Sequence, residues 1–515
     1  MTMRKRITLS ILFLMTGILT FARPDSLHIY SMEEIYRQNS WLDGENPIGL
    51  SFNPFQAFSI AKAGYSHQKG NLGNTAFPSS ADNYSIYSES FQQLGKASVY
   101  GKMGYRNSQK HRINWNGMTG DYWQSLNLCD SVSGKQSAEQ YQLAGAFSLP
   151  VSAHWMVGSR LDYLVELTAK DTDPRNKNQW MEWEFTPGIG YQNKAIRWGA
   201  SFLYSSKKEK VDYQNIGAHS TYPFFISYPL GFFKTLPGDE NVNWHYSAEE
   251  LGGALQLENK FGAFHLYQEI SGRMGEQDIV SRQIQNKKEG ETDLWRIKYN
   301  ARLTRYSSTH FHEWNVRIVY NNSESYDPLQ QQDVNGLWHT YGKVLRSASK
   351  QNEYALEYGY YRLRDDQHPQ FSLVSGVLYN TSKQTIFFYP IKYVQPAHRF
   401  TLHSTLTHNL RLKSGEMNCR IGLKYGKGSG DIMKKEQSQT GQSMPDIKLW
   451  KNPERLEENF NILTGPRWSA RASILYTHTS DLQWFIGIEG EYEKANGNPS
   501  YENKKYFSLQ FGLLF

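Results

Sequence analysis

The sequence lacks the features that mark several common classes of protein. Only 2 of its 515 residues are cysteines, Cys129 and Cys419, and because they lie far apart we expect neither a disulfide nor a metal site. Lysine and arginine (56) barely outnumber aspartate and glutamate (49), and a formal charge of +7 gives no indication of nucleic-acid binding. Long hydrophobic runs are missing after residue 22, so no transmembrane helix is expected beyond that point.

The start of the chain does carry a hydrophobic run, and it has the layout of a secretory leader. Met1–Arg6 is basic, Ile7–Phe21 is almost wholly apolar, and Thr20-Phe21-Ala22 provides small residues before a cleavage point. The run is too short and too early to count as a membrane span, and no cysteine follows it to take a lipid. The sequence therefore predicts a signal peptide over residues 1–22.

Aromatic residues are abundant: 34 tyrosines, 26 phenylalanines and 14 tryptophans make up 14% of the chain. In Lys505–Phe515, every second residue from Phe507 onward is Phe or Leu. A tilted strand of this length matches the hydrocarbon core of a bilayer, and aromatic residues gather at both interfaces of membrane barrels. This stretch predicts the closing strand of a transmembrane β-barrel. Its terminal Phe515 resembles the signal that the bacterial barrel assembly machinery reads, so that machinery is an expected partner.

The same alternation recurs from residue 55 onward. In Met156–Thr168, apolar residues alternate with Arg160, Asp162 and Glu166, and such charged residues must face a lumen rather than lipid. Roughly twenty segments of this kind can be counted, with about eighteen strands as the fallback. The count treats these stretches as separate segments: Thr340–Ser347, Tyr354–Leu363, Thr385–Val394 and the weak candidate His111–Gly117.

Short and long connections alternate between these segments. The predicted short ones include Asn107–Lys110, Ser349–Gln351 and Asn380–Lys383, and the long ones include Ser206–Ser247 and Gly426–Trp468. Outer-membrane barrels keep short turns in the periplasm and long loops outside. We therefore predict an all-β fold: an antiparallel up-and-down transmembrane barrel over residues 55–515, in the outer membrane of a Gram-negative bacterium, with membrane lipid around it.

Residues 23–54 lack strand alternation. Ser31-Met32-Glu33-Glu34 has the form of a capping box, which predicts a short helix from Met32 to about Gln38. Asn46–Phe52 resembles the Asn-Pro-Ala-Gly-Leu segment of the long-chain fatty acid transporter superfamily, in which an N-terminal piece plugs the barrel. A plain turn before the first strand is the alternative, so residues 23–54 are either a periplasmic segment or a plug.

A set of motifs in the first half of the barrel points to a family. The motifs are Lys102–Arg106 with Asn114-Trp115-Asn116, then Asp130–Gly134, Glu139-Gln140-Tyr141 leading to Gly145, and Asp173–Asn176. They resemble a family of uncharacterised outer-membrane barrel proteins described as a domain of unknown function, most closely between Gly64 and Gly217. The chain departs from that pattern at Ser125–Cys129. The resemblance implies a barrel and an outer-membrane location, and no activity.

Charged residues on the predicted inner faces are candidates for lining the lumen. They are Arg160, Asp162, Glu166, Glu182, Glu184, Arg197, Arg296, Lys298, Arg302, Glu313, Arg317, Arg411, Arg420, Lys424, Arg471, Glu489 and Glu491. The register implied by a turn at Thr479–Asp481 places Arg471 opposite Glu489 and predicts an ion pair inside the lumen.

One long loop contains an apolar run that would break the strand topology if it were counted as a strand. Its large residues are Tyr222, Phe224, Phe225, Tyr228, Phe232 and Phe233. We predict that this run folds over or into the pore as a gating loop, or grips a ligand.

No catalytic set is found. Ser404 and His408 share a predicted strand face, but residues four apart on a strand are roughly 13 Å apart, too far for a nucleophile and its base. We therefore predict a protein that is not an enzyme and holds no cofactor or metal: most simply a porin-like passive channel or uptake component for a small-molecule cargo. The alternatives are a barrel that anchors surface loops for partner binding, and a gated pathway for apolar molecules.

Overall fold

The computed structural model describes residues 35–37, 39–53, 57–72, 74, 76–119, 126–217, 220–238, 241–364, 368–437, 450–479, 482–495 and 503–515. The predicted signal peptide and the start of the predicted helix at Met32 lie outside these residues, and Ile35–Arg37 is helical.

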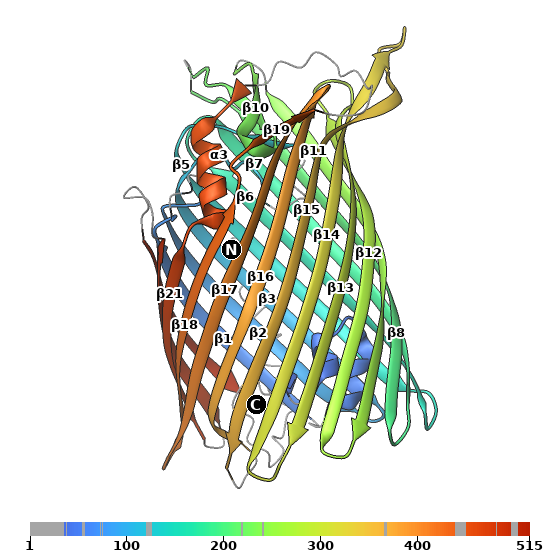
Figure 1. The fold of residues 1–515 in the computed structure, drawn as a ribbon, viewed down its shortest axis with the longest axis vertical. Coiled ribbons are helices and arrows are strands. Elements are labelled where there is room, and N and C mark those ends of the chain that lie inside the picture. The colour runs from blue at the N-terminus through green and yellow to red at the C-terminus, as the bar shows by residue number, and fades with distance from the viewer. Residues whose placement is uncertain are drawn as a thin grey trace, which may run out of the picture.

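Eighteen antiparallel strands form one closed barrel (Figure 1). The first and last strands close it, with Ile60 opposite Leu514 and Lys69 opposite Lys505. Closure pairs the backbone groups of every wall strand on both sides, as a lipid-exposed sheet requires. The wall strands are β1 (Ala57–Lys69), β2 (Ser80–Leu94), β3 (Ala97–Ile113), β5 (Gly134–Pro150), β6 (Trp155–Lys170), β7 (Arg175–Gln192), β8 (Ile196–Gln214), β11 (Val242–Phe261), β12 (Phe264–Ser281), β13 (Lys287–Tyr306), β14 (His310–Gln332), β15 (Trp338–Leu363), β16 (Pro369–Phe388), β17 (Ile391–Leu412), β18 (Gly415–Gly430), β21 (Arg467–His478), β22 (Gln483–Ala495) and β23 (Lys504–Leu514).

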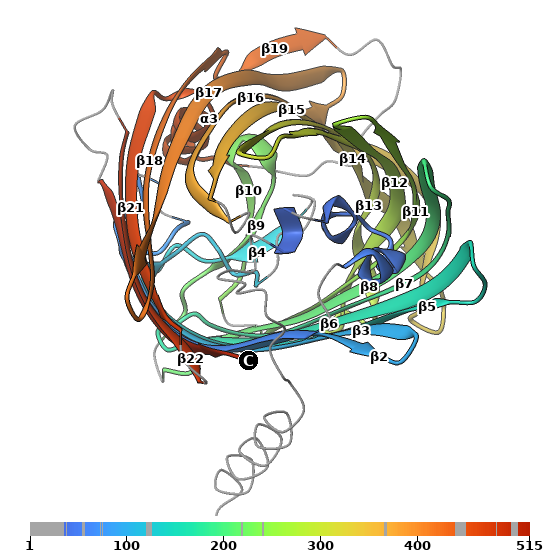
Figure 2. The ribbon, with the colours of Figure 1, turned by 90° about the horizontal axis from the view of Figure 1, so that it is seen from below.

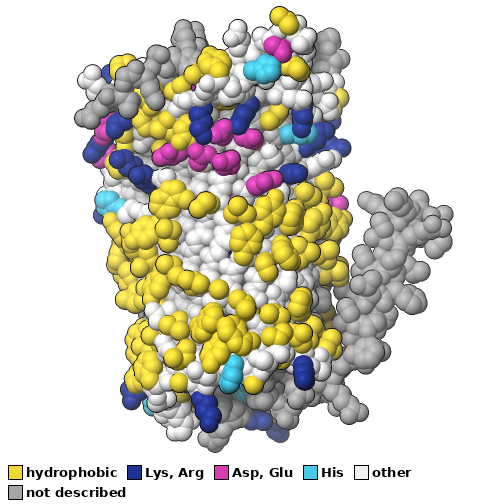
Figure 3. Space-filling model, turned by 90° about the vertical axis from the view of Figure 1, so that its right-hand side faces the viewer, with side chains coloured by type: hydrophobic (Ala, Val, Ile, Leu, Met, Phe, Trp, Pro, Cys, Tyr) yellow, Lys and Arg dark blue, Asp and Glu magenta, His cyan; other side chains and the backbone are white. Residues whose placement is uncertain are grey.

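The outer face of the wall carries an apolar belt. In β23 the outward side chains of Phe507, Leu509 and Phe511 are 45%, 40% and 51% exposed, because nothing but lipid covers them. On the face shown in Figure 3, yellow apolar side chains form a band that is bounded above by Lys, Arg, Asp and Glu. The predicted location in the outer membrane is thereby confirmed.

The two rims of the barrel differ in the length of their connections. Residues 95–96 and 262–263 form short turns at one rim, whereas 215–241 and 431–466 connect strands at the other. Because outer-membrane barrels keep short turns in the periplasm, the first rim is the periplasmic one, at the bottom of Figure 1. The outer rim also has a short connection, 389–390, where two long strands meet.

Eighteen strands match the fallback and not the count of roughly twenty. Thr340–Ser347 and Tyr354–Leu363 belong to one strand, the 26-residue β15. Thr385–Val394 is the outer hairpin between β16 and β17, and His111–Gly117 lies at and beyond the end of β3. One strand, β2, was missing from the predicted set.

The three predicted short turns Asn107–Lys110, Ser349–Gln351 and Asn380–Lys383 are wrong for a single physical reason. Each lies within a strand that continues past the hydrocarbon core, namely β3, β15 and β16. Outside the core, both faces of a strand meet water, so polar residues at successive positions are compatible with a strand and not only with a turn.

Several elements lie inside or above the wall. Near the periplasmic rim, η1 (Ser40–Asp43) and η2 (Pro47–Phe52) sit within the barrel, as the view from below shows (Figure 2). Near the outer rim, β4 (Asn127–Cys129), β9 (Phe224–Ser227), β10 (Phe232–Leu236) and β20 (Trp450–Lys451) form a second sheet. Beside them lie η3 (Pro229–Gly231), α3 (Pro453–Thr464) and β19 (Lys434–Gln437), which pairs with β17. No helix among the described residues is long and apolar enough to cross a membrane.

Candidate functional site

The lower lumen is partly filled by the inner segment, a name used here for residues 35–37 and 39–53. Its η2 helix packs against β5, β6 and β7. Four wall glycines, here named the glycine socket, make room for the segment: Gly158, Gly188, Gly190 and Gly199. A Cβ on Gly188 would lie 2.1 Å from Asn46 Oδ1, and one on Gly190 would lie 2.0 Å from Ile48 Cδ1. Larger residues at these positions would therefore occupy the space that the inner segment fills.

Charge-assisted contacts fix the inner segment to the opposite wall. The Trp41 indole is 1% exposed and donates from Nε1 to Glu258 Oε2 at 2.7 Å. Arg273 joins Glu45 of the segment at 2.6 Å, and Arg302 pairs with Asp43.

Arg37 adds a contact on the β14–β15 side. Its guanidinium lies 5.3 Å from the ring centroid of Phe311 and 5.0 Å from that of Tyr361. Such contacts between charged, largely desolvated groups are stronger than neutral surface contacts, so the segment is held firmly.

A buried carboxylate joins the inner segment to β2 and β3. Glu89 is 4% exposed and accepts hydrogen bonds from the hydroxyls of Tyr36 (3.2 Å), Tyr100 (2.7 Å) and Tyr87. Three donors on one carboxylate offset the cost of removing its charge from water. The strand that carries Glu89 was absent from the sequence prediction.

The upper lumen is covered by the lid, defined as β4, β9, η3, β10 and β20. Its apolar side packs against inward side chains of β8, β11 and β12, among them Tyr213, Trp244 and Ile279. The Cys129 thiol is fully buried in the lid, and burial raises its pKa to about 12. Lys170 of β6 donates to Asp130 at 2.6 Å, and both side chains are buried.

The predicted gating residues all belong to the lid or lie next to it. Phe224, Phe225, Tyr228 and Phe232 are buried, Phe233 is partly buried, and Tyr222 is exposed. In Figure 2 the strands β9 and β10 lie within the outline of the barrel. The run therefore lies inside the barrel near its outer rim, and whether it acts as a gate or grips a ligand stays a prediction.

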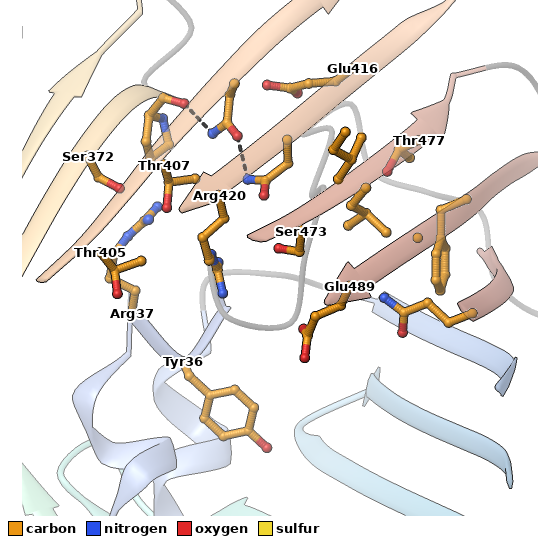
Figure 4. Close-up of a pocket in the computed structure, with 18 of the residues that line it drawn as sticks. Tyr36, Arg37, Ser372, Thr405, Thr407, Glu416, Arg420, Ser473, Thr477 and Glu489 are labelled. Atoms are coloured by element: carbon orange, nitrogen blue, oxygen red, sulfur yellow. Dashed lines mark hydrogen bonds between the residues drawn. The ribbon is translucent and has the colours of Figure 1, made fainter. Parts of the chain in front are cut away.

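Between the inner segment and the wall lies a main cavity of about 950 Å³. Its lining comes from β1–β3, β13–β18 and β21–β23, together with Tyr36, Arg37 and Asp43 of the inner segment; Figure 4 shows part of it. Polar side chains predominate: Arg420 and Glu489 project into the space, and Thr405, Thr407 and Ser473 lie around them. Such a lining is compatible with water and polar solutes.

Two smaller cavities lie toward the outer rim. One of about 440 Å³ lies between the inner wall of β14–β17 and the end of α3, and another of about 310 Å³ lies between α3 and η3. The two cavities share Gln384, Ile462 and Leu463 as lining residues. These two cavities are therefore neighbours on the β14–β17 side, whose strands also line the main cavity farther from the outer rim.

The structure places all seventeen lumen candidates on the inward faces of their strands. Arg302, Glu313, Arg420, Arg471 and Glu489 line the main cavity. The predicted ion pair of Arg471 and Glu489 is present, at 2.5 Å, but the predicted register is wrong: Arg471 lies opposite Glu491, and the pair forms diagonally. The remaining candidates lie elsewhere on the inner wall: Arg160 with Asp162, Glu166 near Gln140, Glu182 with Lys207, Glu184 with Arg273, Arg197 over Phe52, Arg296 with Asn321, Arg317 with Glu353, and Lys298, Arg411, Lys424 and Glu491 in phase with these residues.

Sequence reasoning missed several lumen residues. Glu357 lines the main cavity and pairs with His403 at 3.0 Å. The alternation in Tyr354–Leu363 would have found Glu357, because it shares the inward phase of that strand. Ser404 and His408 face outward in phase with the apolar residues of β17, and Ser404 hydrogen-bonds Ser375 instead.

Both cysteines are free. Among the described residues, no three His, Cys, Asp or Glu side chains form a group that could hold a metal ion.

The sequence matches one family model across nearly the whole barrel. The match covers residues 47–515, and the model is described as DUF6850, a family of unknown function. The chain belongs to this family. The predicted resemblance to an uncharacterised outer-membrane barrel family is confirmed, while the similarity of Asn46–Phe52 to fatty acid transporters stays a prediction. No curated protein matches the sequence.

Solved structures with a similar course of chain are large outer-membrane barrels. The ferric preacinetobactin receptor BauA from Acinetobacter baumannii is 9% identical, with a TM-score of 0.40 and coverage of 89% of this chain and 80% of that one. The ferric yersiniabactin uptake receptor FyuA from Yersinia pestis is 8% identical, with a TM-score of 0.42 and coverage of 89% and 80%. The outer membrane transporter YddB from Escherichia coli is 10% identical, with a TM-score of 0.39 and coverage of 88% and 80%. Sequence identities and TM-scores this low do not support any transfer of function to this chain.

Proposed function

We propose that this DUF6850 protein is a gated, passive uptake channel for small polar molecules. The observation that carries the proposal is the main cavity of about 950 Å³, lined by polar and charged side chains inside a closed barrel. A barrel that serves only as an anchor has no need of such a space, because a lumen can be filled by packed side chains.

The lining favours polar cargo over apolar cargo. Arg420, Arg471 and Glu489 project into the main cavity, and hydroxyl groups such as that of Ser473 lie between them. An apolar molecule would remove water from these groups without replacing their hydrogen bonds, which costs free energy for each group. The alternative of a pathway for apolar molecules is therefore disfavoured.

Two barriers would control passage. The inner segment acts as the periplasmic plug in this proposal, because the glycine socket and the contacts of Trp41 and Arg302 hold it in the lower lumen. The lid acts as the outer barrier, because its apolar packing against β8 and β11 covers the upper lumen. Cargo would pass along the β14–β18 side, where the cavities lie.

Planar-bilayer recording of the purified protein tests the channel. Stepwise currents, together with uptake of a small uncharged polar solute into proteoliposomes, are the expected result. A folded protein that gives neither current nor uptake, even when the inner segment has been loosened by substitution, would favour the anchor alternative.

A further inference from the structure

The cavity of about 440 Å³ beneath α3 has an unusual lining. We name it the amide cavity, after the side chains that the inner wall contributes. These are Asn321, Gln351, Asn380, Ser382 and Gln384, with Glu353 and Arg399 beside them and Ile462 and Leu463 of α3 opposite. Its volume falls within the range of small-molecule sites, which is about 300–1,000 Å³.

The strand register places these polar groups side by side. Asn321 lies opposite Gln351, and Gln351 lies opposite Ser382 on the next strand. In the adjoining row Glu353 lies opposite Asn380. Side chains opposite one another on an antiparallel sheet have Cβ atoms about 5 Å apart, so the row forms one continuous surface of hydrogen-bonding groups.

The charged groups at this surface already have partners. Glu353 pairs with Arg317 at 2.6 Å. Arg399 donates to the carbonyl oxygens of Ile462 at 3.1 Å and Gly426 at 3.3 Å. A cationic ligand would therefore have to displace Arg317 from Glu353, whereas a neutral ligand would not.

Asn321 accepts a hydrogen bond from Arg296 at 2.6 Å, whereas three other polar side chains of the cavity are available. Within the described part of the chain, the side chains of Gln351, Asn380 and Ser382 make no hydrogen bond to the protein. Each amide offers two donors and an acceptor at closely spaced positions. This matches a ligand that presents neighbouring groups able both to donate and to accept, as the hydroxyls of a sugar do.

Part of the cavity lining is apolar. Ile462 and Leu463 of α3 border the cavity, as do Val319 and Ala397 of the wall. A sugar ring has hydroxyls at its edge and C–H groups on its faces, and it can therefore satisfy both kinds of lining at once. A short peptide carries an ammonium group, and Glu353, the carboxylate among the lining residues, already pairs with Arg317.

We infer that the amide cavity binds a neutral sugar unit of an oligosaccharide. The site lies on the proposed route, because it shares Gln384, Ile462 and Leu463 with the outer cavity between α3 and η3. Its role as an uptake site rests on the proposed function, but binding itself can be measured without any transport.

Calorimetric titration of the full-length protein in a polyoxyethylene detergent, which has no sugar headgroup to compete, tests the inference. The probes are maltotriose, cellotriose and raffinose, with glycylglycylglycine as the peptide comparison. At least one trisaccharide should bind, and Gln351→Leu and Asn380→Leu should each weaken that binding roughly tenfold, the effect of losing one or two neutral hydrogen bonds. Gln268→Leu is the matched control, because Gln268 lies on the outer face of β12 and bonds Tyr299 there.

Folding of each variant is checked by its heat-dependent migration in gels, and conductance is recorded on the same samples. Absence of trisaccharide binding by folded protein, unchanged affinity in both leucine variants, or tighter binding of the tripeptide would each overturn the inference. Sugar binding without conductance or uptake would leave the site in place and remove the channel. Conductance without sugar binding would leave the channel in place and remove the sugar site.

Discussion

Trp41→Ala is the substitution that tests most directly whether the inner segment blocks the lumen. Trp41 is 1% exposed, its ring lies 5.0 Å from that of Phe52 and 5.5 Å from that of Tyr267, and its N–H donates to Glu258. Replacing a buried Trp by Ala costs about 3–5 kcal/mol, including the lost hydrogen bond. The ratio of docked to released segment should therefore fall by about two to three and a half powers of ten.

A second variant loosens the same segment from the other side. In Gly190→Leu the new side chain takes the place of Ile48 in the glycine socket, where a Cβ alone would lie 2.0 Å from Ile48 Cδ1. Overpacking of this kind costs about 1–3 kcal/mol. Two variants with the same effect through different contacts would assign it to the segment rather than to one side chain.

Two measurements on the same protein make the test decisive. Maleimide labelling of Ser40→Cys, in a background without native cysteines, reports release of the segment, and planar-bilayer recording reports opening. Both should increase in Trp41→Ala and Gly190→Leu. Trp295→Ala is the control, because this outward Trp is 45% exposed and faces lipid. Faster labelling with unchanged conductance would show that the segment is not the barrier, and the plug would have to be abandoned.

Three further predictions concern the lumen, the lid and an outer loop. Glu489→Gln leaves Arg471 as an added positive charge in the main cavity, so the reversal potential in a salt gradient should shift toward anion selectivity; stability should change by no more than about 1 kcal/mol because the Arg471 side chain is half exposed. An unchanged reversal potential would place this pair outside the conduction path. In a Cys419→Ser background, the Cys129 thiol should react with maleimide far more slowly than an exposed cysteine does, because Cys129 is fully buried and its pKa is raised to about 12. Rapid labelling of Cys129 would mean that the lid opens often. The carboxylate of Asp173 accepts hydrogen bonds from the backbone N–H of Gly217 (2.7 Å) and from the Arg175 guanidinium (2.8 Å), and these contacts lower its pKa. The contact between Asp173 and Gly217 should therefore be complete at pH values above the ordinary carboxyl pKa and lost as the pH falls through the lowered pKa. Hydrogen exchange of the Gly217 amide should then become faster, and in Asp173→Asn it should be fast at every pH.

The outward faces of the strands were readable from the sequence for a physical reason. Lipid is the same apolar solvent along every strand, so each outward residue meets the same requirement and the pattern is local. β23 and β6 were predicted on this basis, with bounds close to those observed. β2 was missed because its inward Phe91 is buried against the inner segment while outward positions include Ser88 and Ser90, which blurs the contrast between the faces.

The strand count failed where the membrane ends. Long strands such as β14 and β15 continue into the outer rim, and there the alternation changes phase at bulges near Tyr326 and Gln330. A period-2 pattern that shifts by one residue looks like two segments with a turn between them. The bulges fall within Thr340–Ser347, and this segment was separated from Tyr354–Leu363 because the polar residues between them, including Ser349–Gln351, were interpreted as a turn.

The inward faces could be recognised as inward, but their partners could not be named, and this difference explains the limits of the candidate site. The pair of Arg471 and Glu489 was predicted from a register that is wrong by two residues, because Arg471 lies opposite Glu491 and Glu489 lies opposite Ser473. The ion pair still forms, because a shift of two keeps both residues on the inward face and their long side chains meet diagonally. The contact between Trp41 and Glu258 joins residues 217 positions apart, and no local pattern indicates it. A residue that faces lipid meets one solvent, whereas a residue that faces the lumen meets a particular neighbour from another part of the chain. The sequence therefore predicts which residues point into the lumen, and only the fold shows that some of them hold the inner segment while others line the cavities through which a solute could pass.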